Sequence, residues 1–122
     1  MSESRLRTLS IDFAVQILNL VKLLKSQHET IISNQIGRAG TSIGANIYEA
    51  QYAHGKADFI AKLQIALKET NETSYWLELL LKTNYIDEGC KKSFLRKMTP
   101  TVTFLNIFHR RGKYKNNAHN FA

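Results

Sequence analysis

Apolar residues recur along the chain at intervals of three and four positions, and no stretch alternates between apolar and polar residues. This spacing keeps side chains on one face of an α-helix, as with Phe13, Ile17, Leu20 and Leu24. The pattern predicts four amphipathic helices, over residues 9–26, 30–52, 56–82 and 87–111. Ser10 is a suitable N-cap for the first helix.

The second predicted helix carries three glycines, Gly37, Gly40 and Gly44, inside one apolar pattern. Each glycine costs about 1 kcal/mol relative to alanine in a helix interior. Three such costs indicate that another element packs closely against this helix. We expect the helix to end at His54 and Gly55, since glycine commonly follows the last helical residue.

The third and fourth predicted helices complete the pattern. The third has the near-heptad spacing that favours packing at about 20° between helix axes, and Asn84 closes it. The fourth contains Pro100 at its middle. Proline either kinks a helix or restarts it, and the apolar spacing continues in phase across Pro100, which favours a kink. Four amphipathic helices with short connections predict an all-α, antiparallel up-down-up-down four-helix bundle.

The length of 122 residues fits one domain, over residues 1–122, with a flexible basic tail at about 113–122. No apolar run is long enough to cross a membrane, and the N-terminus lacks the apolar region of a secretory signal. The single cysteine cannot form an internal disulfide. We therefore expect a cytoplasmic protein without a membrane partner.

The positive charge is concentrated at the C-terminus. Residues 1–90 hold nine Lys and Arg against ten Asp and Glu, a balance of −1, whereas residues 91–122 hold eight Lys and Arg and no acid, a balance of +8. This asymmetry favours a polyanionic partner, although a solvated helix face and tail is the alternative. The candidate contacts for RNA or DNA are Lys92, Arg96, Arg110, Arg111, Lys113 and Lys115.

Aromatic residues accompany these cations. Phe104, Tyr114 and Phe121 are candidates for stacking on bases, although packing is the favoured role of Phe104. Phosphate contacts of this kind give binding that depends on salt and not on sequence. The alternative function is a protein-interaction scaffold whose basic tail only adds solubility.

Four stretches of the chain resemble a known family. They are QIGRAGTSIGANIYEA (residues 35–50), DFIAKLQIALKETNETSYWLELL (residues 58–80), TNYID (residues 83–87) and FAVQIL (residues 13–18). All four resemble the bacterial four-helix-bundle family of 23S ribosomal RNA intervening-sequence proteins. The chain departs from the family pattern at Gly37, where a larger residue is usual, and at Tyr48, where an acid is common.

The resemblance implies a small four-helix bundle that assembles with copies of itself, as a ring-shaped homopentamer. Related proteins include the accessory protein of diversity-generating retroelements, a basic ring that works with reverse transcriptase and RNA. Many genes of the family lie inside insertions in 23S ribosomal RNA genes. The resemblance implies no molecular activity.

The motifs of common helical enzymes are missing from the sequence. No Glu is followed by a His three residues later, as in di-iron bundles, and the zinc motif His-Glu-x-x-His is absent. Glu69 and Glu72 are better explained by ion pairs with Lys or Arg. Cys90 lies beside cations that would lower its pKa, but a core role is favoured. We expect no enzyme, no catalytic residue, no metal and no cofactor.

Two further groups of residues have candidate roles. Small and apolar residues outside the main core stripe are candidates for close helix packing or contact between subunits: Gly37, Thr41, Gly44, Ile65 and Trp76. Polar residues of the second and third helices are candidates for one structural network that fixes helix register: Arg38, Ser42, Asn46, Glu49, Glu69 and Glu72. A ligand site at the network is the alternative.

Overall fold

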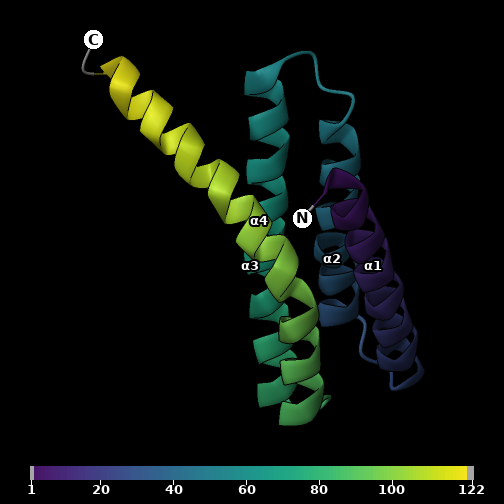
Figure 1. Cartoon of the computed structure of the whole chain (residues 1–122). Helices are drawn as coiled ribbons and strands as arrows, with labels where there is room; N and C mark the ends of the chain where they lie inside the picture. The colour runs from purple at the N-terminus through teal and green to yellow at the C-terminus, as the bar shows by residue number, and fades with distance from the viewer. Residues whose placement is uncertain (1, 121–122) are drawn as a thin grey trace.

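Four helices make up the described part of the protein in a computed structural model that describes the backbone of residues 2–120 and the side chains of residue 2 and residues 4–108. They are α1 (Glu3–Ser26), α2 (Ile31–Ala50), α3 (Lys56–Lys82) and α4 (Glu88–Asn120). Consecutive helices run in opposite directions, and each packs against two neighbours in a cycle that α4 closes against α1 (Figure 1). The predicted all-α four-helix bundle is confirmed.

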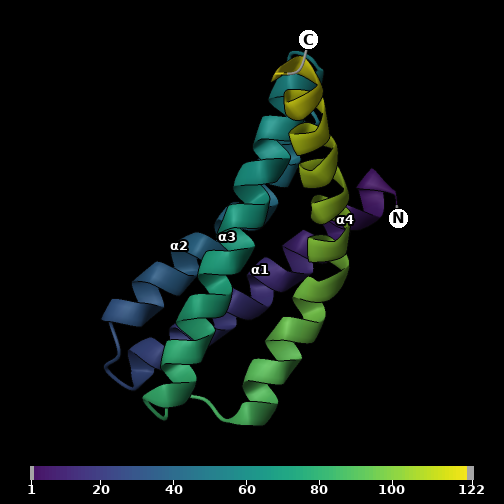
Figure 2. The same ribbon diagram turned by 90° about the vertical axis from the view of Figure 1, so that its left-hand side faces the viewer.

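The helices form two hairpins that cross at an angle. Figure 2 shows the α1–α2 hairpin inclined relative to the α3–α4 hairpin. The core lies between them and contains the apolar residues that the spacing predicts, including Ile17, Ile36, Leu63 and Leu77, all of them almost completely buried. The buried hydroxyl of Thr73 donates to the Glu69 carbonyl of its own helix at 2.8 Å, so it needs no partner across the core.

The first helix begins earlier than predicted, and Ser10 is not its N-cap. The Ser2 hydroxyl accepts a hydrogen bond from the Arg5 backbone N–H at 3.1 Å and caps the helix. The core stripe extends back to Leu6, which is 2% exposed. Ser10 therefore falls inside the helix, where it is buried and donates to the Arg7 carbonyl at 2.8 Å.

Two helices end on a residue in the left-handed conformation. His28 follows α1 with φ of 64° and Asn84 follows α3 with φ of 66°. After α3, the N–H groups of Asn84 and Tyr85 donate to the Leu81 and Leu80 carbonyls, the hydrogen-bond pattern of a Schellman motif. The end of the third helix at Asn84 is thus as predicted.

The second helix is capped at its start by a side chain that precedes it. The carboxylate of Glu29, a buried residue, accepts hydrogen bonds from the backbone N–H groups of Ile31, Ile32 and Ser33 at 3.0, 2.9 and 2.7 Å. At its other end α2 stops at Ala50, before the predicted end.

Gly55 does not end α2, as the sequence led us to expect. It is instead the N-cap of α3, with φ of 140°. An L-residue rarely adopts this backbone conformation, so a side chain there would strain the connection between the two helices.

The fourth helix runs through Pro100 without a restart, as the in-phase spacing favoured. Figure 1 shows that α4 follows α3 in its first half and turns away from it in its second. Proline removes a helix hydrogen bond and is the usual cause of such a bend. The helix continues to Asn120, beyond the predicted end at Arg111.

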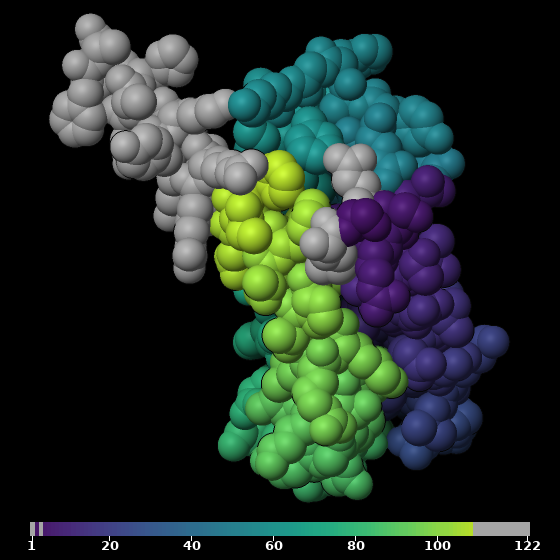
Figure 3. All heavy atoms as spheres, in the orientation of Figure 1, coloured from purple at the N-terminus to yellow at the C-terminus, as the bar shows by residue number. Residues whose placement is uncertain are grey.

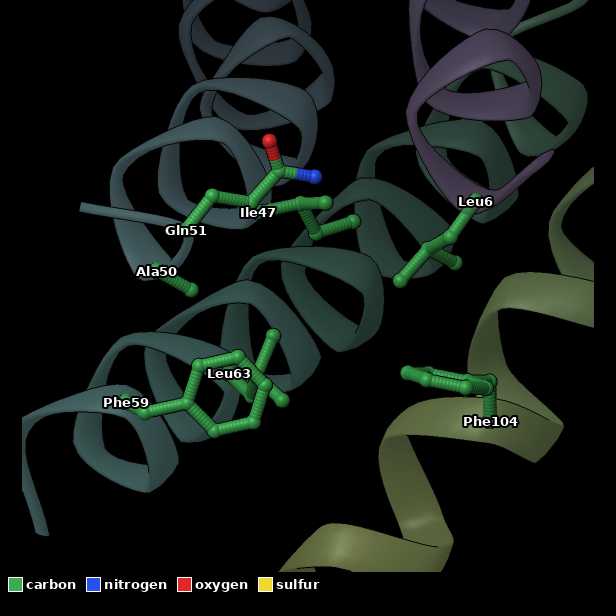
Figure 4. Close-up of a pocket in the computed structure, with 7 residues that line it drawn as sticks. All are labelled: Leu6, Ile47, Ala50, Gln51, Phe59, Leu63 and Phe104. Atoms are coloured by element: carbon green, nitrogen blue, oxygen red, sulfur yellow. The ribbon is translucent and has the colours of Figure 1, made fainter. Parts of the chain in front are cut away.

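Where α4 turns away, a small apolar pocket lies between all four helices. Figure 4 shows Leu6 of α1, Ile47 of α2, Leu63 of α3 and Phe104 of α4 pointing into it. The residues therefore mark one end of the bundle, at which α1 and α3 begin and α2 ends. The α4 helix passes this end before it reaches its C-terminal cations.

Candidate nucleic-acid interface and assembly surface

Two of the six candidate cations have described side chains, and both are available to solvent. Lys92 and Arg96 are exposed on α4, and neither forms an ion pair among the described residues. They lie four positions apart, so they share one helix face. Arg110, Arg111, Lys113 and Lys115 fall outside the described side chains, and their roles stay predictions.

The other cations at the start of α4 have partners within the chain. Lys91 forms an ion pair with Glu78 of α3, and this contact raises the pKa of Lys91 and lowers that of Glu78. The Lys97 ammonium lies 5.7 Å from the centre of the Phe94 ring. Part of the +8 charge is therefore used to hold α4 against the bundle.

Aromatic packing fixes α4 beyond Pro100. The centres of the Phe104 and Phe108 rings lie 5.0 Å apart, and the centres of the Phe108 and Phe59 rings, on α4 and α3, lie 5.5 Å apart. Phe104 is half-buried against the core, so its role is packing. Tyr114 and Phe121, the other candidate stacking residues, lie outside the described side chains.

The glycines of α2 face α1 of the same chain. A Cβ at Gly40 would lie 2.7 Å from Cγ1 of Ile17, a separation that real Cβ atoms essentially never show. A Cβ at Gly37 would lie 3.3 Å from Val21, and one at Gly44 would lie 3.2 Å from the Ser10 hydroxyl. The close contact expected at this helix is thus an intrachain one. Its tightest point, Gly40, was missing from the candidate residues.

Thr41 lies beside these glycines and makes its hydrogen bond within its own helix. Its hydroxyl donates to the Gly37 carbonyl of α2 at 2.7 Å. Of the candidates on α3, Ile65 is 42% exposed. Trp76 is partly buried against the core, and its ring lies 5.0 Å from that of Tyr75.

A row of exposed apolar side chains lies on α1 instead. Ile11, Val15 and Leu18 are 56%, 49% and 47% exposed and form what we call the α1 outer stripe. They recur at spacings of four and three, half a turn away from the core residues Phe13 and Ile17. The signal was present in the sequence as a second apolar period within the same helix, and the sequence reasoning missed it.

The candidate polar network is divided in the structure. Arg38 of α2 lies against two carboxylates of α3, pairing with Glu72 and approaching Glu69 with a nitrogen–oxygen distance of 3.6 Å. The Trp76 indole N–H also donates to Glu72 at 3.3 Å. Hydrogen bonding and opposite charge raise the pKa of Arg38, and the hydrogen bond to Arg38 lowers the pKa of Glu72.

The remaining members of the network make separate contacts. The Ser42 hydroxyl donates to the Arg38 carbonyl, and the Asn46 amide donates to the Ser42 carbonyl, both within α2. Glu49 pairs with Lys62 of α3 at 3.2 Å. The structure therefore links α2 to α3 through two ion-pair clusters and not through the asparagine.

Two further candidate chemistries are a reactive thiol at Cys90 and a metal site. Cys90 is half-buried, and burial together with the charge of Asp87 raises the pKa of its thiol, so the alternative of a lowered pKa is wrong. Within the described residues, no group of three or more His, Cys, Asp and Glu is placed to hold a metal ion. No described helix is long and apolar enough to cross a membrane.

The sequence and the fold were each compared with those of known proteins. Residues 3–106 match the sequence profile of the family described as 23S rRNA-intervening sequence protein. The fold is similar to a crystal structure from Bacteroides thetaiotaomicron of a protein with unknown function from the S23 ribosomal protein family. That similarity has a TM-score of 0.79 and 51% identity, and it covers 82% of this chain and 94% of that one. No curated protein matches.

Proposed function

Because the chain belongs to the 23S rRNA-intervening sequence protein family, we propose that it is a non-enzymatic, homo-oligomeric helical bundle that binds RNA or another nucleic acid through its basic C-terminal helix. The observation that carries the proposal is the balance of +8 over residues 91–122, against −1 over the rest of the chain. Nucleic-acid backbones are dense in negative charge, and cations that neutralise them release counterions.

Exposed Lys92 and Arg96 support this role, since both are free of ion pairs among the described residues. Contacts of this kind position a phosphate backbone without reading its bases. We therefore expect binding that tolerates changes of sequence and weakens steeply with salt.

The α1 outer stripe supports assembly. Three large apolar side chains on the side of a helix opposite its core remain in contact with water in the single chain, and such surfaces commonly mark interaction sites. Burial between copies would remove that apolar area from water. An oligomer, of which a pentamer is our expectation, would also repeat the basic surface, so that several weak phosphate contacts act together.

The binding proposal is tested by titrating a structured RNA at two salt concentrations. We expect the logarithm of the binding constant to fall linearly with the logarithm of the salt concentration. Each phosphate contact removed should make this decline shallower by roughly 0.7–0.9. Replacing Lys92 and Arg96 by Ala should lower the affinity and make it less dependent on salt. Replacing Lys56 and Lys68 of α3, which are exposed, removes the same charge and should change affinity and salt dependence little. The proposal would be contradicted if the two double variants lost the same affinity, or if the wild-type protein did not bind the RNA at low salt.

The assembly proposal is tested by light scattering. Leu18→Glu places a charge on the α1 outer stripe and should lower the molar mass. Gln16→Glu introduces an acid at an exposed position of the same helix outside the stripe and should leave the molar mass unchanged. A monomeric wild-type protein would refute homo-oligomerisation.

A further inference from the structure

Two tyrosines stand exposed at the end of α2. Tyr48 in the last turn is 46% exposed, and Tyr52, just beyond the helix, is 67% exposed. Their ring centres lie 5.5 Å apart with the planes inclined at 49°. A hydrogen bond to Tyr48 raises the pKa of the Tyr52 phenol. Exposed tyrosine rings, which join an apolar face to a polar tip, are common at binding sites.

A cation lies over this pair. The Arg7 guanidinium of α1 sits 5.0 Å from the centre of the Tyr48 ring. Glu49, the acid next to Tyr48 in the sequence, pairs with Lys62 of α3 instead. The rings thus have a positive neighbour, which suits an anionic ligand with aromatic groups.

The tyrosine pair lies at the same end of the bundle as the bend in α4. Leu6, Gln51 and Phe104 line one pocket at one end of the bundle. Arg7 follows Leu6 and Tyr52 follows Gln51, so the tyrosine pair lies at the end that α4 passes on its way to its C-terminal cations. Figure 3 shows α1 and α4 side by side on one face of the molecule.

Resting on the proposed function, we propose that Tyr48, Tyr52 and Arg7 form a stacking site for unpaired bases, which makes single-stranded nucleic acid the preferred ligand. Duplex bases are stacked on one another and cannot lie on a protein ring, whereas splayed bases of a single strand can. The tyrosine rings would take the bases, and Arg7 would take an adjoining phosphate. Such a site accepts any base, because every base has a flat aromatic face.

The test compares two fluorescent RNAs at low salt by anisotropy: an unstructured oligouridylate of about 12 nucleotides and a duplex of similar length. Tyr52→Ala should weaken binding of the single strand roughly tenfold and leave duplex binding unchanged. Tyr52→Phe, which keeps the ring, should bind like the wild type. Tyr75→Ala removes an equally exposed tyrosine of α3 and is the matched control.

Each failure has its own signature. Equal affinities of Tyr52→Ala and Tyr75→Ala would overturn the stacking site, and a loss confined to Lys92→Ala and Arg96→Ala would leave the proposed function standing. No binding of either RNA by the wild type would overturn both. A lowered molar mass in Tyr52→Ala with unchanged RNA affinity would overturn the stacking site and place these rings in contacts between copies. Circular dichroism checks that each variant is folded.

Discussion

The closest contact between α1 and α2 predicts opposite effects for two similar substitutions. At Gly40→Ala the new Cβ would lie 2.7 and 2.9 Å from Cγ1 and Cγ2 of Ile17. Ile17 is 0% exposed, and both atoms are bonded to its Cβ, so the side chain has little freedom to turn away. At Gly37→Ala the Cβ would meet only Cγ2 of Val21 at 3.3 Å, and Val21 is half-buried.

The size of each effect follows from two terms of opposite sign. Alanine in place of glycine stabilises a helix by about 1 kcal/mol, whereas an extra methyl group in a packed contact costs about 1–3 kcal/mol. We expect Gly40→Ala to destabilise the protein by about 1 kcal/mol. Gly37→Ala, with a small packing cost, should stabilise it by about 0.5 kcal/mol.

Thermal unfolding at one fixed protomer concentration measures the difference. At roughly 4 °C per kcal/mol for a domain of this size, the two variants should differ in Tm by about 6 °C. Ile17→Val in the Gly40→Ala background should recover little of the loss, because it removes only Cδ1, at 3.1 Å from the new Cβ, and keeps the two closer γ carbons. Equal stabilisation by both alanine substitutions would refute the close approach of α1 to Gly40.

Three other predictions concern helix ends and ion pairs. Glu29→Ala leaves three N–H groups at the start of α2 without acceptors and should cost about 2–4 kcal/mol in urea unfolding, with a smaller loss for Glu29→Gln, which keeps one acceptor. His28→Gly should stabilise by up to about 1 kcal/mol, since φ of 64° suits glycine, and unchanged stability would argue against that conformation. The lowered pKa of Glu72 means that its pair with Arg38 stabilises the fold above the ordinary Glu range and is lost as pH falls through the lowered value. Arg38→Ala should therefore reduce stability at neutral pH, by less than about 1 kcal/mol at this partly exposed site, and should make no difference once Glu72 is protonated.

The sequence predicted the helices well where one periodic pattern and one end signal agree. The third helix was predicted over residues 56–82, as found, because its near-heptad spacing stops at an asparagine that tolerates the left-handed conformation. The predicted start of the first helix was wrong, because Ser10 is a residue type that often caps helices. Leu6, which continues the core spacing, indicated an earlier start. An isolated cap signal was given more weight than one further apolar position.

The candidate site was predicted less well, because a sequence does not say which neighbour a face will meet. Three glycines in one helix require a close contact, but their spacing cannot distinguish α1 from a second copy of the chain. The same limit applies to Glu29, whose role depends on the turn at His28 that brings its carboxylate back over the start of α2. Arg38, Glu69 and Glu72 stood together in the predicted polar network, and the structure places Arg38 against both acids, which lie three positions apart on one face.

The way α1 packs inside the chain decides which of its surfaces is left for assembly. The glycine face of α2 is filled by α1, so it cannot also receive a partner subunit. The apolar area of α1 still in contact with water includes Ile11, Val15 and Leu18, which lie opposite the core. A side chain at Gly40 would push α1 away from α2 and move this stripe with it, because the stripe belongs to the same helix as Ile17. A methyl group at Gly40 should therefore weaken assembly as well as folding, although it lies on the far side of α1 from the stripe.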